Sequence, residues 1–458
     1  MIYWRTMASI SNCSVYLPVW RLKRDEIAKA TGLPSLGGEK SVAHWDEDSI
    51  TMAVEAARVL EGRFDAVLFA STSSPFKIKQ AASFIASALD LEDVFTMDFS
   101  GSLRASTNAL ITANDLVDSG RFSKVLVIAS DCIPVKPSSL YEQYYGDAAV
   151  ALTVVKEGKA KIVGYSSYSQ PLPGAWMLKD EVASFDMRLD GIGYGKAVQQ
   201  SAMSLFKKLG MSPKDFDRIV CSAPDPRSYE GLMKSIGVRP EEFFFDKVGI
   251  AGTAHPFLLL ASQLERPGRI LLGGYGEGLD VLAIEINEPL QTNLRRMLES
   301  KKEISYGDYL YNKGFLGFRE APDRPSLTKY WREEKSILRF YGMRCKNCGT
   351  VSYPISKGCV ECGARDNFEE VKLGFKGKIY TFTIDYLVSP GNTVGDGAHP
   401  HCVAVVDLEG GGRVFFEVTD VLRDFTGIEC DAEVERTFRI LFEKGGFRYY
   451  GWKVRLPR

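Results

Sequence analysis

A three-strand pattern that occurs twice is the feature that most limits how this chain can fold. The apolar segments FDAVLFAS (64–71) and KVLVIA (124–129) are followed by a Gly146-Asp147 turn and the segment AAVALTVV. The same order returns as FDRIVCSA (216–223), RILLGG (269–274), a Gly/Asp turn at 278–280 and VLAIEI. Because residues 8 to about 290 alternate such strands with helical segments, we expect an α/β domain with a largely parallel sheet. Two similar halves, about 8–160 and 161–290, should pack face to face around buried central helices.

Residues 98–116 (DFSGSLRASTNALITANDL) predict an extended segment, a tight turn at residues 100–102 and then a helix. Ala105, Ala109 and Ala113 recur at i, i+4 and i+8, so one face of this helix should pack closely against another backbone. Many α/β enzymes hold a nucleophile on such an elbow, where the helix N-terminus favours an anion. No cysteine occupies the elbow of this chain.

The bulk composition describes an ordinary globular protein. The 458 residues suffice for two or three domains, and a formal charge of −1 gives no global field that would recruit nucleic acid or an anionic membrane. The first twenty residues contain no apolar run long enough for a signal peptide, and no later window reaches the length of a spanning helix. We therefore expect a soluble, cytoplasmic protein.

Two CxxC pairs give the strongest local signal. Cys345 and Cys348 form the first pair, Cys359 and Cys362 form the second, ten residues separate the pairs, and a glycine follows each. Four converging thiolates suit a tetrahedral zinc site, with iron as the alternative. Since four protein ligands leave no open coordination position, the Zn2+ should be structural.

The C-terminal part divides into smaller pieces. Residues 291–344 read as a connector that ends in a short amphipathic helix over 331–343, and residues 345–370 hold the metal ribbon. Residues 371–458 contain several short strands separated by Gly and Asp turns, a pattern that favours a small β-barrel of OB type.

Several segments together resemble the thiolase superfamily. They are Ser11-Asn12, DEDSITMAVEAA at 46–57, the elbow at 98–116 and GYGEG at 274–278. The nearest branch is hydroxymethylglutaryl-CoA synthase, with ketoacyl synthase III close by. Residues from about 330 onward resemble the rubredoxin-type zinc ribbon and OB-fold domain that accompanies many thiolases and archaeal hydroxymethylglutaryl-CoA synthases. The resemblance implies a duplicated five-layer fold, a CoA thioester as ligand or substrate, and a dimer or larger assembly.

The catalytic residues implied by the resemblance fall on other residue types in this chain. The nucleophilic cysteine falls on Leu103, the general acid/base glutamate near Ser73, the histidine near Ser222, and the following asparagine or histidine near Ile250. Without a thiolate no acyl-enzyme forms at position 103. The resemblance still places backbone N–H groups of Leu103 and Gly276 where they would hold a thioester oxygen.

Other side chains are candidates for chemistry at this site. Glu142, with Tyr141, Tyr144 and Tyr145 around it, has the right types for proton transfer, although aromatic packing explains the tyrosines as well. The remaining single-residue candidates are His255, Tyr275 and Cys132. His399, His401 and Cys402 have the residue types of a second metal group, but their spacing on a strand places neighbours on opposite faces.

Three functional hypotheses follow. The first is a non-nucleophilic subunit of an acyl-CoA thiolase (acyltransferase) complex, which stabilises a catalytic thiolase and channels its acyl-CoA. The second is a cysteine-independent acyl-CoA lyase (retro-aldol or retro-Claisen) or hydrolase that uses His255, Glu142 or Tyr275. The third is a scaffold or nucleic-acid module built on the ribbon, although the charge balance leads us to expect no nucleic acid and no membrane partner.

Overall fold

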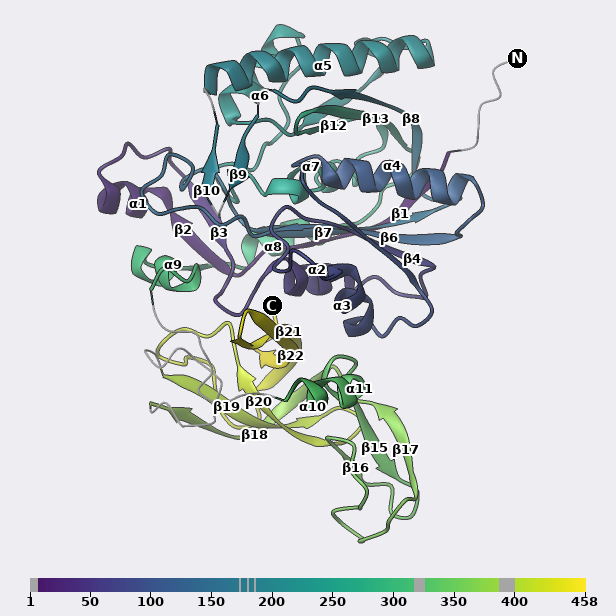
Figure 1. The fold of residues 1–458 in the computed structure, drawn as a ribbon, viewed down its shortest axis with the longest axis vertical. Helices are drawn as coiled ribbons and strands as arrows, with labels where there is room; N and C mark the ends of the chain where they lie inside the picture. Colours follow the sequence, from purple (N-terminus) through teal and green to yellow (C-terminus); the bar gives the residue numbers. More distant parts are fainter. Residues whose placement is uncertain (1–6, 173, 179–180, 185–186, 317–325, 387–399) are drawn as a thin grey trace. The chain divides into compact units, whose positions relative to one another are not determined.

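The computed structural model describes residues 7–172, 174–178, 181–184, 187–316, 326–386 and 400–458 (Figure 1). The chain forms two compact units. The first comprises Met1–Ala43, Asp48–Ala86 and Leu91–Leu310, and the second comprises His44–Glu47, Ser87–Asp90 and Tyr311–Arg458.

A nine-stranded mixed sheet runs through the first unit. From edge to edge its order is β11 (Arg218–Cys221), β12 (Gly268–Tyr275), β13 (Gly278–Ile286), β8 (Ala160–Ser169), β1 (Ser9–Tyr16), β7 (Ala148–Val155), β6 (Lys124–Asp131), β4 (Ala66–Ala70) and β5 (Phe95–Phe99). The predicted repeat has the same pairing in both halves. β4 runs parallel to β6 and β6 antiparallel to β7, as β11 runs parallel to β12 and β12 antiparallel to β13.

The expectation of a largely parallel sheet is wrong. Only the pairs β4–β5, β4–β6 and β11–β12 are parallel, and the other pairs of this sheet are antiparallel. For β12 and β13 the physical reason is their short connection. β12 and β13 are joined by a tight turn, and a parallel pair needs a crossover of a dozen or more residues.

Helices and sheet form five layers in the first unit (Figure 1). One outer layer holds α2 (Ser49–Ala57) and α3 (Ala81–Ala88), and the other holds α5 (Met187–Leu209) and α6 (Pro226–Ser235). The central layer holds α4 (Ala105–Asp118) and α7 (His255–Ala261), which contact each other. Ala105, Ala109 and Ala113 are buried, so the predicted alanine face and its central helix are confirmed.

Smaller elements surround these layers. A three-stranded sheet has the order β14 (Lys302–Glu303), β2 (Trp20–Lys23) and β3 (Glu39–Val42), and a hairpin pairs β9 (Trp176–Leu178) with β10 (Glu181–Ala183). The remaining elements are α1 (Arg24–Thr31), α8 (Leu294–Glu299), α9 (Tyr306–Asn312) and the short 3-10 turns η1 (Pro213–Asp215) and η2 (Gly252–Ala254).

The longest segment of the second unit, Tyr311–Arg458, contains two short helices before its strands, α10 (Leu327–Arg332) and α11 (Glu334–Ile337). A single helix over 331–343 is therefore not what forms. Phe340 adopts a φ of 60°, which ends the helical path, and the chain continues as β15 (Tyr341–Cys345), whose Tyr341 lies opposite Lys372. β15 lies between β16 (Val351–Ser352) and β17 (Phe368–Lys372) in the metal ribbon.

A closed five-stranded barrel follows, as the sequence predicts. Its order is β18 (Lys376–Asp385), β19 (His401–Leu408), β20 (Arg413–Val418), β22 (Phe447–Arg455) and β21 (Glu433–Lys444). Two cations are fully buried among its strands: Lys453 lies 2.5 Å from a carboxylate oxygen of Glu417, and Arg439 lies 2.8 Å from Asp420. Each buried charge thus has an opposite charge within hydrogen-bonding distance, which offsets the cost of removing it from water.

Candidate functional site

The elbow between β5 and α4 positions Leu103. Asp98 at the end of β5 accepts hydrogen bonds from the backbone N–H groups of Ala81 (2.7 Å) and Ala82 (2.9 Å) at the start of α3. Gly101 turns the chain with a φ of 81°, a conformation that favours glycine, and α4 begins at Ala105. Leu103 therefore stands two residues before the first residue of a buried helix, as expected for an elbow.

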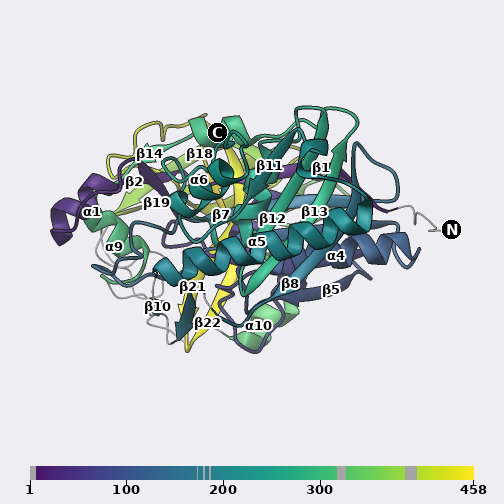
Figure 2. The ribbon, with the colours of Figure 1, turned by 90° about the horizontal axis from the view of Figure 1, so that it is seen from above.

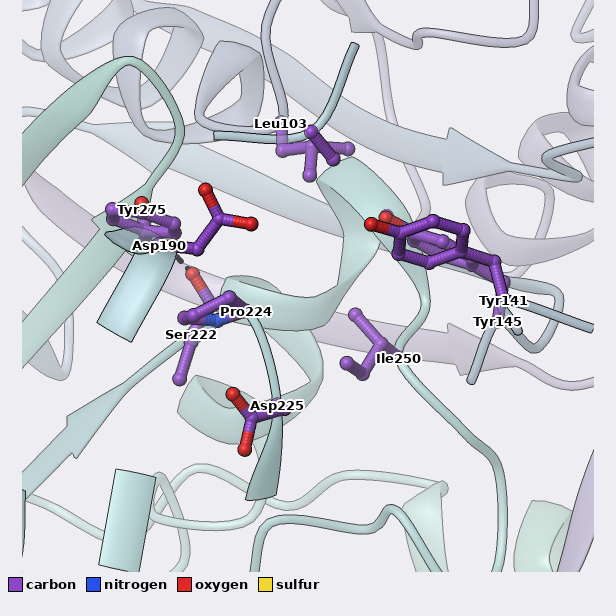
Figure 3. Close-up of a pocket in the computed structure, with 12 residues that line it drawn as sticks. Leu103, Tyr141, Tyr145, Asp190, Ser222, Pro224, Asp225, Ile250 and Tyr275 are labelled. Atoms are coloured by element: carbon purple, nitrogen blue, oxygen red, sulfur yellow. Dashed lines mark hydrogen bonds between the residues drawn. The ribbon is translucent and has the colours of Figure 1, made fainter. Parts of the chain in front are cut away.

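A small pocket surrounds this elbow (Figure 3). It encloses about 40 Å³, enough for a few water molecules. Leu103 forms one wall, Tyr275 and Asp190 a second, and Tyr141 and Tyr145 lie across from them (Figure 3). Its other lining residues are Ala175, Ser222, Ala223, Pro224, Asp225, Ile250 and Gly252. Three positions singled out from the sequence, Leu103, Ser222 and Ile250, thus come together from three separate segments.

The glycine turn between β12 and β13 lies directly against the elbow. A Cβ atom on Gly276 would lie 3.0 Å from the Leu103 nitrogen and 2.8 Å from the Arg104 nitrogen, so only glycine fits there. Ser102 Oγ donates to the Gly276 carbonyl at 3.3 Å. The N–H of Gly276 itself donates to the Gly278 carbonyl at 3.1 Å. Of the two backbone donors considered from the sequence, that of Gly276 is therefore engaged within its own turn.

A buried carboxylate fixes the start of α4. Asp280 on β13 accepts hydrogen bonds from Thr107 Oγ1 (2.7 Å) and Asn108 Nδ2 (2.6 Å), and it pairs with Arg104 at 3.3 Å. Burial raises the pKa of the Asp280 carboxyl, and the Thr107 hydrogen bond opposes that shift. The helix that follows Leu103 is thereby tied to the second half of the repeat.

A second buried carboxylate, Asp131 at the end of β6, organises the loop that contains Ser73. Its Oδ1 accepts from the Ser73 N–H (3.0 Å) and Oγ (2.8 Å), while Oδ2 accepts from the Thr253 N–H (2.7 Å). Ser73 Oγ also accepts from the Cys132 N–H at 2.8 Å. Ser73 and Cys132 thus belong to a hydrogen-bonded loop network, and neither is among the residues that line the pocket.

Of the three side chains proposed for a lyase or hydrolase, His255, Glu142 and Tyr275, it is Tyr275 that lines the pocket. Its backbone N–H donates to Ser222 Oγ at 2.9 Å (Figure 3), and its ring meets Tyr194 edge-on with 5.1 Å between centroids. The hydroxyl is buried and forms no hydrogen bond with any of the described residues. Burial raises the pKa of the Tyr275 phenol, so the group stays protonated at neutral pH and can donate a hydrogen bond.

His255 is a core residue. Its Nδ1 accepts a hydrogen bond from the Ala251 N–H at 3.3 Å, and its ring meets Phe243 edge-on with 4.6 Å between centroids. The side chain is 0% exposed, and burial lowers the pKa of the imidazole to about 3. The neutral ring caps a turn at the start of α7 and is not among the pocket residues.

Glu142 is also held away from the pocket. Its carboxylate accepts hydrogen bonds from the Tyr306 hydroxyl (2.9 Å) and the Ser138 N–H (2.7 Å), and its carbonyl accepts from Lys40 Nζ (2.5 Å). Two of the neighbouring tyrosines, Tyr141 and Tyr145, do line the pocket. The structure thus brings Tyr141 and Tyr145 to the pocket, while the Tyr144 ring packs against Phe245 and Glu142 is held by buried hydrogen bonds.

Asp190 and Asp225 are pocket residues that sequence reasoning missed. Asp190 lies in the first turn of α5 and is buried, and its charge contributes to the raised pKa values of Tyr141, Tyr145 and Tyr275. Asp225, also at the pocket, accepts from the Ser228 N–H (3.0 Å) and Oγ (2.6 Å) and caps α6. Asp190 lies four residues before Tyr194 and therefore on the same face of α5, and Tyr194 packs against Tyr275. This helical spacing was the sequence signal that could have identified Asp190.

The four ribbon cysteines form a cluster suited to a metal ion. The sulfur atoms of Cys345, Cys348, Cys359 and Cys362 all lie within 4.8 Å of one another. Those of Cys345 and Cys362 are 3.7 Å apart, and those of Cys348 and Cys359 are 3.6 Å apart. Such spacings match the edges of a tetrahedral four-thiolate site.

The other metal group considered from the sequence lies partly outside the described residues, because His399 falls in the range 387–399. On β19, His401 lies opposite Asp385 and Cys402 opposite Val418, and the Cys402 side chain is buried. The side chains of His401 and Cys402 thus point to opposite faces of the strand, as the sequence predicts.

Family comparisons match three segments of the chain. Residues 97–171 match the family described as 3-oxoacyl-(acyl-carrier-protein) synthase III. Residues 332–369 match the ChsH2 rubredoxin-like zinc ribbon domain, and residues 370–439 match the ChsH2 C-terminal OB-fold domain. These matches confirm the predicted thiolase-type domain, zinc ribbon and OB-fold barrel.

Individual proteins extend the first match. The chain is 30% identical to the hydroxymethylglutaryl-CoA synthase of Aeropyrum pernix over 68% of its own length and 96% of that protein. It is 30% identical to the hydroxymethylglutaryl-CoA synthase of Methanopyrus kandleri over 66% of its own length and 96% of that protein.

Solved structures agree on the fold. An HMG-CoA synthase complexed with CoA aligns with a TM-score of 0.63 at 18% identity, over 70% of this chain and 94% of that one. The HMG synthase of the curacin biosynthetic pathway, in complex with acetyl donor-ACP, aligns with a TM-score of 0.58 at 21% identity, over 67% of this chain and 88% of that one. Among the described residues, no helix combines the length and apolar character that crossing a bilayer requires.

Proposed function

Because the chain belongs to the hydroxymethylglutaryl-CoA synthase family, we propose that its first unit binds CoA thioesters at the pocket around Leu103 without forming an acyl-enzyme there. The observation that supports this is the position of Leu103 at the elbow, in one pocket with Ser222 and Ile250. By resemblance these three positions carry the family's nucleophile, histidine and asparagine. An aliphatic side chain at the elbow removes covalent catalysis and keeps an apolar wall.

Binding would rest on the backbone and on shape. The Leu103 N–H lies just before the N-terminus of α4, where the helix dipole favours negative charge on a thioester oxygen. Asp280 and Arg104 hold this helix start in place, so the donor is pre-oriented. Gly276 adds no free donor, because its own N–H donates to Gly278. Its contribution is that a residue without a Cβ lets the turn approach the elbow closely.

The chemistry itself would come from a partner. We propose that the chain is the non-nucleophilic subunit of an acyl-CoA thiolase (acyltransferase) complex and that its ribbon and barrel help to pass acyl-CoA to the catalytic subunit. Self-association is supported by β5, an edge strand of the sheet. Its Phe95 and Met97 are 43% and 37% exposed, and an apolar edge of this kind is a ready surface for strand pairing.

The ribbon would hold zinc through Cys345, Cys348, Cys359 and Cys362. Four thiolates close the coordination sphere, so the bound ion would supply folding energy and no reaction step. Iron is the alternative ion for the same four ligands.

The test is to measure binding and turnover on the same full-length preparation. We expect the purified chain to bind acetyl-CoA by calorimetry, to form or cleave no C–C bond alone, and to support condensation when its co-purifying thiolase is added. Formation or cleavage of C–C bonds by the isolated chain at about 1 s⁻¹ or faster, within the ordinary range of enzymes, would contradict the proposal.

A second candidate is a cysteine-independent acyl-CoA lyase, for which Tyr275 is the supporting observation. Its protonated phenol faces the pocket, where it would donate a proton to the enolate left by C–C cleavage. His255 and Glu142 lie outside the pocket lining and have structural partners, so the proton donor would be Tyr275. Full activity of Tyr275→Phe in a chain that does turn over acyl-CoA would eliminate this candidate.

A further inference from the structure

A second cavity in the first unit is lined by residues of α5, α6, β11, β12 and β13. Figures 1 and 2 show that α5 lies across the strands on this side of the unit. We call this second cavity the α5 cavity. Its volume is about 390 Å³, within the range of small-molecule sites. The cavity opens to the surface, since Met203 and Ile236 on its lining are 59% and 40% exposed, so a ligand could reach it.

The lining of the α5 cavity is almost entirely apolar. α5 contributes Val198, Ala202 and Phe206, α6 contributes Leu232, and the sheet contributes Leu271 and Val281. None of the described residues that line it carries a charge. Such a surface suits a hydrocarbon chain, and it offers no cation to a free carboxylate.

Gly195 on α5 keeps part of this space open. A Cβ atom added at Gly195 would meet no heavy atom within 4 Å, so close packing does not require glycine there. Glycine in a helix interior is less favourable than alanine. Its presence on the lining is therefore a feature that costs helix stability and leaves room in the cavity.

The α5 cavity adjoins the pocket around Leu103. Asp190, Tyr194, Val198 and Ala202 follow one another at four-residue spacing on one face of α5. Asp190 lines the pocket, whereas Val198 and Ala202 line the α5 cavity.

Tyr194 lies between these positions and meets Tyr275 edge-on. On β11, Cys221 lines the α5 cavity, and the next residue, Ser222, lines the pocket. Tyr194, whose ring lies against Tyr275, therefore stands on α5 between residues that line the two spaces.

We propose that the α5 cavity holds the aliphatic chain of a medium-length acyl thioester whose thioester group lies near Leu103. The proposal rests on the proposed function and names its substrate class. The chain would pass from the pocket to the α5 cavity by displacing the ring of Tyr275 or Tyr194, and the apolar lining would receive it. The free fatty acid is the other source of the same hydrocarbon, and the missing cation disfavours it.

The test compares acetyl-CoA, decanoyl-CoA and sodium decanoate by calorimetry on the full-length chain. Gly195→Leu fills the cavity, and Gly231→Leu is its matched control, because Gly231 is an exposed helical glycine on α6 that also has nothing within 4 Å of an added Cβ. We expect decanoyl-CoA to bind at least tenfold more tightly than acetyl-CoA to the wild type and to Gly231→Leu. In Gly195→Leu this preference should fall below threefold while acetyl-CoA binding stays unchanged.

Each other outcome decides the matter as well. Equal affinities for the two thioesters, or a preference that survives in Gly195→Leu, overturn the proposal, and so does tight decanoate binding without any gain for decanoyl-CoA. If neither thioester binds, the proposed function fails independently of the cavity. The cavity is then tested by decanoate, whose binding to the wild type should be lost in Gly195→Leu. If Gly195→Leu does not fold, Ala202→Leu, which lines the same cavity, takes its place.

Discussion

The carboxylate of Asp131 accepts a 2.7 Å hydrogen bond from the backbone N–H of Thr253, which joins the end of β6 to the start of the second central helix. The same carboxylate accepts from the hydroxyl of Ser71 and from the N–H groups of Thr72 and Ser73. One fully buried side chain therefore fixes two loops from different halves of the repeat. The relative position of these halves is what brings Leu103, Ser222 and Ile250 to one pocket.

Asp131→Asn should destabilise the first unit by about 3 kcal/mol, because the amide keeps one acceptor and turns a donor toward groups that are themselves donors. The measurement is the first thermal or urea transition of the full-length chain. Asp118→Asn is the control, since Asp118 pairs with Lys156 at the surface and its loss should cost less than about 1 kcal/mol. Equal effects of the two substitutions would contradict this account of Asp131.

Local sequence patterns predicted the elements of this protein well. The repeated strands, the alanine face of α4 and the CxxC pairs are short-range regularities, and each has a direct geometric meaning. The relative direction of the strands was harder to predict. The turn at 276–277 is a hairpin that makes β12 and β13 antiparallel, and the alternation of strands and helices alone pointed to parallel pairing.

The candidate site was predictable only in part. Leu103, Ser222 and Ile250 were identified through family resemblance, and the pocket contains all three. The contacts of Asp131 with Ser73 and Thr253 join residues 58 and 122 positions apart, and no periodicity reports such pairs. Asp190 was missed for a related reason: its place at the pocket depends on how α5 lies over the sheet.

His255 should give a distinct pH dependence of stability. Its imidazole has a pKa of about 3 in the folded chain, against an ordinary value of 6.5, because burial disfavours the charged form. Between these values the unfolded chain binds the extra proton, so the contribution of this residue is present above pH 6.5 and is lost as the pH falls. The loss is about 1.4 kcal/mol per pH unit.

The check is the free energy of unfolding of wild type and His255→Gln between pH 7 and pH 4. Gln cannot take up a proton, so the stability difference between the two proteins should shrink, or change sign in favour of the variant, as the pH falls. A difference that stays constant with pH would show that the imidazole is not held neutral. Binding of acetyl-CoA at pH 7 should be unchanged in the folded variant, since His255 does not line the pocket.

Leu103→Cys should restore a reactive thiol at the elbow. A cysteine just before the N-terminus of α4 would have a lowered pKa, and a bound thioester analogue would lie against it. We expect chloroacetyl-CoA to alkylate this position, detected by intact mass and peptide mapping, which separates it from the native cysteines. Leu103→Ala, which has no thiol, is the control for labelling elsewhere. An unmodified Cys at position 103 in a protein that binds acetyl-CoA would place the thioester somewhere else.

Removal of one ribbon ligand should release the metal and unfold the ribbon while leaving the first unit intact. Cys348→Ser takes away one of four thiolates, and a structural zinc ribbon depends on the complete set for its folding energy. Metal analysis should find one zinc per wild-type chain and less than a tenth of that in Cys348→Ser. Cys430→Ser is the matched control, because Cys430 is also exposed and lies outside the cluster, so it should keep its metal. Iron in the wild type would correct the identity of the ion, and full metal content in Cys348→Ser would refute the four-thiolate site.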